Sequence, residues 1–470
     1  MNDTYNRKLP FKIKLSYGLS GYCSFIGWTA FSYYGLYFFT DVVGISAAFA
    51  GAMISLGTLW DAVTDPIVGS ISDNLKTKSG ERRRPLILGV AFPFVLITIL
   101  MFTNWGFDEV VSKVYFAIAV IMYYTAQTVL DISASALGSE MTNDYDERAA
   151  LATWKNYFGL MATVAISPTL VLVAYFGGWF KNSDFGWSMT IALYMIIALV
   201  FIFILWKNTK GYERNRGEGS TKFAFKDIIE ILKNKPARIV IIIFAIAIFA
   251  NTINYAVQVY YYTNYVGLSS GQIATITFIF GAVSIVMAWV VDRLMQKLSK
   301  KAAWVISVGL EGIVLIVMVG CLIKPGTSIG TIYLMTVLMS LGNAAVYQVP
   351  WAMIPDCVDV HELVSGKRID GVIFGIVAFA QKAAGAIGAA VLGVILSVVG
   401  YDANAAVQTT EALSGLKNVY GILVGALYLI AVLISLRYPL SKERHDSVCK
   451  AIDAHKNGEG VDMSEFKSLI

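Results

Sequence analysis

Three acidic residues lie inside long apolar stretches of the 470-residue chain, where they could bind a cation. Asp61 and Asp65 are four residues apart, so a helix carries both on one face, and Asp131 lies in another apolar stretch. Each ionised carboxylate near the centre of a bilayer costs about 2.5–3.5 kcal/mol, and two like charges on one face oppose each other's ionisation. A bound cation would remove both costs, because carboxylate and hydroxyl oxygens are good ligands for hard ions.

We therefore predict that Asp61, Asp65, Thr128 and Asp131 bind a cation, with Asp61 and Asp65 as the metal ligands if the ion is Na⁺ or Li⁺. Thr128 stands three residues before Asp131 and shares its helix face. Two alternatives remain open. Lys, backbone or water could hold the carboxylates in a rigid core, or the carboxylates could stay protonated and relay protons.

Basic and aromatic side chains inside apolar stretches could contact a substrate. Lys382 lies deep in the second half, where it could neutralise Asp131 or Asp61 or contact a substrate carboxylate or hydroxyl. The alternative is a charge lock that only holds the two halves together. Most aromatic residues of a membrane protein face lipid, pack in the core or anchor the interfaces. The aromatic candidates for stacking on a ligand include Trp28, Tyr347 and Trp351.

The composition indicates that these residues lie in a membrane. Hydrophobic residues make up 57% of the chain and charged residues only 15%, whereas soluble domains have about 25% charged residues. This balance excludes a disordered chain and a nucleic-acid binder, and the four scattered cysteines indicate no disulfide framework. Since neither a phosphate-binding loop nor a nucleophile–base pair stands out, we do not expect an enzyme.

Twelve apolar segments are long enough to cross a bilayer, because about 20 apolar residues span a hydrocarbon core of about 30 Å. We expect an all-α integral membrane protein with twelve transmembrane helices, near residues 15–40, 45–73, 86–104, 112–140, 149–176, 186–206, 238–264, 271–295, 302–323, 328–352, 371–399 and 418–437. Pro66 and Pro168 fall inside two of these segments, where neighbouring helices would satisfy the backbone groups that proline leaves free.

The chain contains an internal repeat. The segment YFFTDVVGIS at 37–46 matches YYYTNYVGLS at 260–269 at five of ten positions. Two six-helix halves around a polar loop are typical of the major facilitator architecture, whose substrate site lies near the midplane between the halves. Most Lys and Arg residues fall on the side of both termini, which predicts that both termini are cytoplasmic. The predicted parts are an N-terminal half at 1–206, a cytoplasmic loop at 207–237, a C-terminal half at 238–440 and a cytoplasmic tail at 441–470.

Two loops on the predicted cytoplasmic side, at 73–85 and 356–368, mix acidic residues with Lys and Arg. Ion pairs there could latch one conformation of a transport cycle and release in another. The predicted gate residues are Asp73, Arg82, Arg83, Arg148, Asp356, Asp359, Glu362, Lys367 and Arg368. The second loop lacks a convincing metal-ligand spacing, so we do not predict a metal site in it.

Several motifs resemble the glycoside–pentoside–hexuronide:cation symporters of the major facilitator superfamily, over nearly the whole chain. They include Lys14-Leu-Ser-Tyr-Gly18, Trp60-Asp-Ala-Val-Thr-Asp-Pro-Ile-Val-Gly69, Asp131-Ile and the Asp-Cys-Val-Asp loop that starts at Asp356. The resemblance implies a sugar symporter driven by Na⁺, Li⁺ or H⁺. It places the family's cation-binding carboxylates on Asp61 and Asp65 and its threonine on Thr128. The family's membrane aspartate and lysine fall on Asp131 and Lys382.

The sugar-binding positions depart from the family pattern. Phe25 stands where a sugar-binding aspartate is expected, and Ser135, Gln127 and Asn156 replace a tryptophan, a tyrosine and an arginine. Lys155 lies beside Asn156, and together with Lys382 it makes an anionic sugar such as a uronide a candidate substrate. The predicted substrate-binding residues are Trp28, Gln127, Asp131, Lys155, Asn156, Tyr347, Trp351 and Lys382.

We predict a secondary symporter that takes up a sugar or glycoside with a monovalent cation by alternating access. It would work as a monomer in the bacterial inner membrane, without a cofactor beyond the coupling cation and without a nucleic-acid partner. Two other functions remain open. One is a transporter of an amphipathic solute such as a lysolipid or drug, and the other is a membrane sensor that transports nothing.

Overall fold

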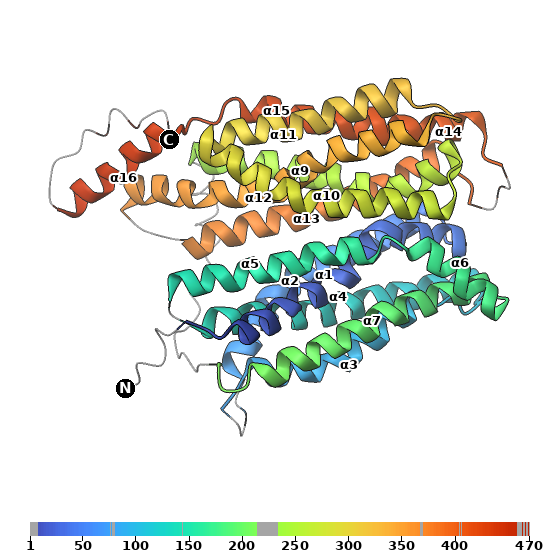
Figure 1. Cartoon of the computed structure of the whole chain (residues 1–470), viewed down its shortest axis with the longest axis horizontal. Helices are drawn as coiled ribbons and strands as arrows, with labels where there is room; N and C mark the ends of the chain where they lie inside the picture. The colour runs from blue at the N-terminus through green and yellow to red at the C-terminus, as the bar shows by residue number, and fades with distance from the viewer. Residues whose placement is uncertain are drawn as a thin grey trace. The chain divides into compact units, whose positions relative to one another are not determined.

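The computed structural model shows a helical chain (Figure 1). The structure describes residues 8–75, 77, 80–142, 144–213, 234–366, 370–403, 405, 407–457, 463, 466 and 469, and no strand occurs among them. Most of the predicted central loop and the end of the predicted tail therefore lie outside the described residues.

The helices and the short π-helical turns between them follow one another with short connections. The first group is α1 (Phe11–Tyr37), η2 (Phe38–Val42), α2 (Ala47–Asn74), α3 (Arg83–Met101), α4 (Glu109–Glu140), α5 (Tyr145–Ala165), α6 (Thr169–Phe180) and α7 (Ser183–Asn208). The second group is α9 (Lys235–Tyr260), η3 (Tyr261–Val266), α10 (Ser270–Lys297), α11 (Lys300–Val314), η4 (Leu315–Leu322), α12 (Ile329–Ser365), α13 (Asp370–Val398), α14 (Thr410–Lys417), η5 (Asn418–Leu423), α15 (Val424–Ser435) and α16 (Lys442–Lys456).

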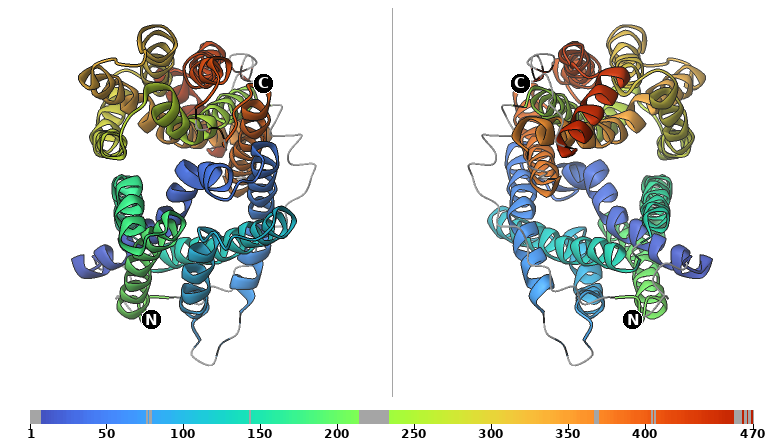
Figure 2. Two further views of the ribbon diagram at one scale, coloured as in Figure 1. Left: turned by 90° about the vertical axis from the view of Figure 1, so that its right-hand side faces the viewer. Right: turned by 90° about the vertical axis from the view of Figure 1, so that its left-hand side faces the viewer.

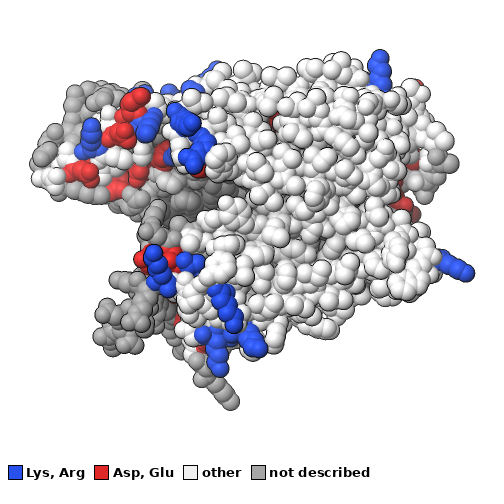
Figure 3. Space-filling view, in the orientation of Figure 1, with Lys and Arg blue, Asp and Glu red and all other residues white. Residues whose placement is uncertain are grey.

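Their lengths and composition fit a membrane protein. In the described part of the chain, ten helical segments are long and apolar enough to cross a bilayer, and the bent pair α5 and α6 makes an eleventh. The 27-residue helix α1 corresponds to the remaining predicted span. On the face drawn in Figure 3, charged side chains gather towards the helix ends and leave a broad uncharged band between them. The prediction of an all-α membrane protein is confirmed.

The fifth predicted span is a broken helix. α5 ends at Ala165, α6 begins at Thr169, and the two helices are bent by 50° relative to each other. Pro168 stands at the break, because its ring removes the N–H group that a continuous helix needs and clashes with the preceding turn. Pro168 therefore lies at a break within predicted span five, whereas Pro66 lies inside the helix α2.

The two repeated segments have the same local structure. Each forms a π-helical turn, η2 or η3, and ends at a glycine with positive φ, +83° at Gly44 and +75° at Gly267. The N–H of Ile45 bonds to the carbonyl of Phe39, and that of Leu268 bonds to the carbonyl of Tyr262 in the same pattern. Glycine is needed at both turns, because other residues rarely adopt positive φ.

The helices group into two compact units. Unit 1 contains Met1–Ser220, Tyr255–Ala282 and Ala389–Gly415, and unit 2 contains Thr221–Asn254, Val283–Gly388 and Leu416–Ile470. Unit 1 thus combines the first predicted half with one end of α9, most of α14 and parts of α10 and α13. The two units are defined by contacts between residues, so they do not test whether the chain consists of two repeated halves. The predicted division at the central loop stays a prediction.

α1 is a largely buried helix of unit 1, whose helices are viewed from their two ends in Figure 2. Most residues of α1 are buried, and the helix packs against α5 and α7. Gly21 permits the contact with α5, because a side chain there would overlap the backbone of Lys155. α2 and α13 also touch through glycines: a Cβ atom on Gly51 would lie 2.6 Å from the carbonyl oxygen of Ala389 and 2.9 Å from the Cα of Gly393.

Candidate functional site

The contact between α2 and α4 in unit 1 brings together several of the predicted cation ligands. The hydroxyl of Thr128 donates a hydrogen bond to Oδ1 of Asp61, and it lies 3.4 Å from the hydroxyl of Thr64. Thr64 and Thr128 are buried, whereas Asp61 and Asp65 are half-buried. The structure therefore gathers one carboxylate and two hydroxyl oxygens at this helix contact, with the second carboxylate one turn further along α2.

Hydrogen bonds and close packing fix the register of these two helices. The hydroxyl of Thr58 lies 2.9 Å from that of Tyr124, and the indole N–H of Trp60 donates to Thr125 over 2.9 Å. A side chain at position 57 would overlap Tyr124, so Gly57 lets α4 approach. The face of α2 that begins at Thr58 and includes Asp61 is therefore held against α4, as its three-residue spacing predicts.

Asp131 forms an ion pair within the same unit. Nζ of Lys155 on α5 lies 2.9 Å from Oδ1 of Asp131 and 2.7 Å from the hydroxyl of Ser135. The side chain of Lys155 is 15% exposed and that of Asp131 is 42% exposed. Lys155 of the neighbouring helix thus compensates the charge of Asp131, and the predicted role of Asp131 as a cation ligand stays a prediction. The sequence contained a signal for this pair, since both residues stand inside predicted spans four and five.

The other predicted substrate residues of unit 1 lie on α1, α4 and α5. The amide of Gln127 donates to the carbonyl of Ser24 over 2.6 Å, while its Oε1 atom is buried without a hydrogen-bond partner among the described residues. Trp28 packs edge-to-face on Phe25, with ring centroids 6.0 Å apart. Asn156, the neighbour of Lys155, is exposed.

Tyr347, Trp351 and Lys382 belong to unit 2. The hydroxyl of Tyr347 donates to Oδ1 of Asn251 over 3.3 Å, and Trp351 stacks on Phe374 with ring centroids 6.0 Å apart. Lys382 lies on α13 and is half-buried. The predicted roles of these three residues in substrate binding stay predictions.

In unit 1, the predicted gate residues form a cluster of ion pairs around Glu140. Arg82 and Arg83 lie 3.2 and 3.3 Å from its Oε1 atom, and Arg83 also pairs with Asp73. The guanidinium of Arg148 donates to the carbonyl of Thr142 over 2.8 Å. The sequence analysis missed Glu140, although its place at the end of a predicted span beside these arginines could have indicated it.

A second residue that the sequence analysis missed is Glu213. Its carboxylate accepts hydrogen bonds from the backbone N–H groups of Arg82, Arg83 and Arg84 at the start of α3. An acidic group is favourable there, because the first N–H groups of a helix have no partner within the helix and carry a partial positive charge.

In unit 2, the predicted gate residues contact α11 and α16. Lys300 lies 2.7 Å from Asp356, and His445 of α16 lies 3.0 Å from Asp359. Donor atoms of Asp359, His445 and Cys449 lie within 4.8 Å of one another, as in a metal site. The prediction that this loop holds no metal site stays a prediction, since three donor atoms close together do not by themselves make a metal site.

The remaining gate residues are less defined. Glu362 lies on α12 and is half-buried. Lys367 and Arg368 lie outside the described residues. The gate ion pairs named above join elements of the same unit, and the predicted role of these residues as a conformational latch stays a prediction.

Asp41 makes a hydrogen-bonded contact at the end of α1, just beyond predicted span one. The hydroxyls of Tyr401 and Thr40 both donate to the Asp41 carboxylate, and the Thr40 hydroxyl also lies 2.7 Å from that of Tyr260. Tyr260 and Tyr401 come from the second half of the sequence but belong to unit 1. Partial burial raises the pKa of Asp41 to about 6, although the hydrogen bonds from Thr40 and Tyr401 oppose this rise.

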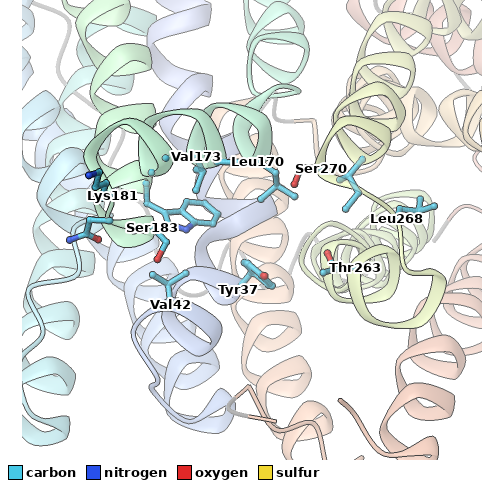
Figure 4. Close-up of a pocket in the computed structure, with 15 residues that line it drawn as sticks. Tyr37, Val42, Leu170, Val173, Lys181, Ser183, Thr263, Leu268 and Ser270 are labelled. Atoms are coloured by element: carbon cyan, nitrogen blue, oxygen red, sulfur yellow. The ribbon is translucent and has the colours of Figure 1, made fainter. Parts of the chain in front are cut away.

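A pocket lies near the same end of unit 1 (Figure 4). Its volume is about 360 Å³, and its lining includes Tyr37, Leu170, Val173, Lys181, Thr263 and Leu268. The lining contains none of the predicted cation-binding or substrate-binding residues, so the pocket is separate from the α2–α4 contact.

The comparisons with known proteins agree with this arrangement. Residues 16–442 match the sequence model of the family described as MFS/sugar transport protein. The chain belongs to the glycoside–pentoside–hexuronide:cation symporters of the major facilitator superfamily. It is therefore a multi-pass membrane transporter of the sugar-symporter type, and it is not an enzyme.

The relatives of this family member carry related names. It is 28% identical to the putative glycoside/cation symporter YagG of Escherichia coli, over 96% of this chain and 97% of that protein. It is 29% identical to the isoprimeverose transporter of Lactiplantibacillus pentosus, over 88% and 86% of the two chains. It is also 26% identical to the glucuronide carrier protein homolog of E. coli, over 96% and 97%.

Solved structures of major facilitator transporters share the fold. The D-xylose–proton symporter is 15% identical and superposes with a TM-score of 0.65, over 92% of this chain and 98% of that chain. A bacterial homologue of the lysosomal transporter Spinster is 12% identical and gives a TM-score of 0.68, over 93% and 100%. At these identities the similarity shows the fold alone, and it confirms the predicted major facilitator architecture.

Proposed function

We propose that this symporter couples inward movement of Na⁺, Li⁺ or H⁺ to uptake of a sugar or glycoside by alternating access. The cation site consists of Asp61, Asp65 and the hydroxyl of Thr128. The hydrogen bond between Thr128 and Asp61 is the observation that carries this proposal, because it holds a hydroxyl and a carboxylate oxygen together at a helix contact. Such oxygens are the ligands that hard cations prefer.

The sugar binds at the ion pair of Asp131 and Lys155. Asp131 is 42% exposed, so its carboxylate can accept hydrogen bonds from sugar hydroxyls while Lys155 compensates its charge. The ammonium group has three donors, and two of them point to Asp131 and Ser135, which leaves a third for a ligand oxygen. Trp28 and Gln127 of the same unit, Asn156 beside Lys155, and Tyr347, Trp351 and Lys382 of unit 2 complete the proposed substrate residues.

The arrangement favours neutral glycosides, and uronides are the second candidate. Lys155 already neutralises Asp131, so a uronide carboxylate would need another cation, for which Lys382 is the candidate. The names of the relatives support both classes, since one is an isoprimeverose transporter and another a glucuronide carrier homolog. Cation and sugar binding strengthen each other by the same factor, as linkage requires.

The proposed topology, membrane and oligomeric state are those predicted from the sequence. Both termini are cytoplasmic, the protein lies in a bacterial inner membrane, and a monomer is sufficient for transport. The gate residues at the cytoplasmic ends of the helices exchange ion-pair partners between the states of the cycle.

Uptake into vesicles that contain the purified protein tests the proposal. Neutral glycosides and glucuronides are supplied with and without a Na⁺ gradient at fixed pH, and then with a pH gradient alone. We expect one sugar to accumulate in response to one of the gradients. Asp61→Asn and Asp65→Asn should abolish accumulation, whereas Asp108→Asn should not, since Asp108 caps the start of α4 away from the site.

Accumulation at the wild-type level in both variants would refute the cation site. Suppose that sugars are not transported and do not raise the melting temperature, whereas a lysolipid raises it. The proposed substrate class is then wrong, and the transporter carries an amphipathic solute. A sugar that binds without flux would instead support a sensor.

A further inference from the structure

Glu311 is a buried acidic residue that the proposed transport mechanism does not use. It lies in the middle of the membrane-spanning segment formed by α11 and η4, and its exposed fraction is 0%. The amide of Asn254 on α9 donates to its Oε1 atom over 3.4 Å, which is longer than a strong hydrogen bond. Among the described residues, its Oε2 atom has no hydrogen-bond partner, and no Lys, Arg or His forms an ion pair with it.

The packing makes room for this carboxyl group. Gly342 of α12 lies directly against Glu311, and a side chain at position 342 would overlap both Cβ and Oε2 of Glu311. The carboxyl group of Glu311 is therefore enclosed between α11 and α12. An ionised carboxylate in such a place costs several kcal/mol unless it is paired.

Two further polar groups lie on the same face of α11. Trp304 and Ser307 precede Glu311 by seven and four residues, a spacing that places all three on one side of a helix. Both are fully buried, and neither the indole N–H of Trp304 nor the hydroxyl of Ser307 has a partner within the described residues. From Trp304 to Glu311 the three groups span about 10 Å along the helix axis, and Trp304 lies near the start of α11 at Lys300. Buried polar groups of this kind are usually satisfied by ordered water.

The described residues that pack directly against Glu311 are uncharged. α9 presents Asn254 to it, and α12 presents Gly342. The charged residues of the neighbouring helices that the structure describes, such as Lys235 on α9 and Asp356 on α12, lie towards the ends of those helices. α15, which also packs on α11, carries no charged residue.

The titratable groups nearest in the polar network are two tyrosine hydroxyls. Tyr428 of α15 and Tyr347 of α12 both contact Asn251, one turn before Asn254 on α9. Neither phenol carries a charge at neutral pH, so neither can stabilise an ionised Glu311.

We propose that Glu311 is a proton-binding site, at which the carboxylate takes up a proton from hydronium to become a neutral carboxylic acid. Water molecules along Trp304 and Ser307 carry the proton between Glu311 and the aqueous phase at the Lys300 end of α11. The transfer is balanced, since hydronium gives its proton to the carboxylate and leaves as water. This site is separate from the cation site proposed at Asp61 and Asp65.

Infrared spectroscopy of the full-length protein in lipid vesicles tests the assignment directly. The wild-type protein should show the C=O stretching band of a protonated carboxyl group near neutral pH, with a frequency shift after exchange into D₂O. Glu311→Gln keeps the shape and the contact with Asn254 but should lose this band. Thr336→Val should retain it, because among the described residues the partner of the buried Thr336 hydroxyl is the carbonyl of Ile332 on its own helix.

A band of equal intensity in wild type and Glu311→Gln would overturn the proposal. If Glu311→Gln does not fold, the glutamates of the wild-type protein are labelled with ¹³C instead, and a band that does not shift on labelling cannot come from Glu311 and would overturn the proposal. Ser307→Ala should slow the exchange of the band into D₂O at least several-fold, and unchanged exchange would refute the water path. The proposal is independent of the sugar, because the band is measured without substrate.

Discussion

Lys155 on α5 and Asp131 on α4 form an ion pair with a distance of 2.9 Å between Nζ and Oδ1. The pair lies inside predicted spans, where a single charge of either sign would be expensive. Gly21 of α1 makes it possible, because the backbone of α5 at Lys155 touches the backbone of α1 there. The charge of Asp131 is therefore compensated by Lys155 of the same unit. Asp61, in contrast, accepts a hydrogen bond from Thr128, which is uncharged.

Breaking this pair should affect stability and transport differently. Lys155→Met leaves Asp131 without its ammonium partner, so we expect a fall in melting temperature of several degrees and loss of sugar uptake. The double variant Lys155→Met/Asp131→Asn removes both charges and should recover most of the stability but not the uptake. Thermal unfolding and vesicle uptake of the three proteins measure the two effects. Full uptake by the double variant would show that the pair is only structural.

The hydrogen bond from Thr128 to Asp61 should set the affinity for the coupling cation. A hydrogen bond to a charged group is worth about 1.5–3 kcal/mol, which corresponds to roughly 10- to 150-fold in binding. Thr128→Val should therefore weaken cation binding by about this factor, whereas Thr128→Ser should stay close to wild type. Titration of the bound cation by calorimetry gives the constants. Equal affinities for Thr128→Val and Thr128→Ser would exclude the hydroxyl from the site.

The free energy of unfolding should depend on pH through the titration of Asp41. Its pKa in the folded protein is about 6, above the value of about 3.9 expected in an unfolded chain, so the unfolded state loses its proton first. The melting temperature should therefore fall as the pH rises from about 4 to about 6, and this component should be absent in Asp41→Asn.

Tyr401→Phe provides the matched control for Asp41. The hydrogen bond from Tyr401 lowers the pKa of Asp41, so its removal should extend the fall in stability to higher pH. The measurement is thermal unfolding followed by tryptophan fluorescence across this pH range. The same pH profile in Asp41→Asn as in wild type would contradict the assignment.

The glycine contact between α2 and α13 should not tolerate a side chain. A methyl group at position 51 would overlap the backbone of Ala389 and Gly393, so Gly51→Ala should push the two helices apart. We expect a loss of about 1–3 kcal/mol in stability, as for other overpacked contacts. Gly89→Ala is the control, because nothing lies within 4 Å of a Cβ atom there. A melting temperature of Gly51→Ala equal to that of Gly89→Ala would show that the contact does not constrain the helices.

Much of this protein can be read from its composition and local patterns. The long apolar stretches require helices in a bilayer, because every backbone polar group must be satisfied within lipid. Asp61 and Asp65 share a helix face through their spacing alone, and the repeat around Gly44 and Gly267 predicts two segments with one conformation. These properties depend on residues that are close in sequence, so no tertiary contact is needed to infer them.

Other properties depend on which helices meet. The pairing of Asp131 with Lys155, the hydrogen bond between Thr128 and Asp61, and the role of Glu140 beside Arg83 all join residues that are distant in sequence or on separate helices. The break at Pro168 could not be predicted from the sequence, because a proline inside a membrane helix is compatible with either a kink or a complete interruption. Burial of Glu311 beside Gly342 likewise arises only from packing, since hydropathy records how apolar a segment is but not which neighbour encloses each of its side chains.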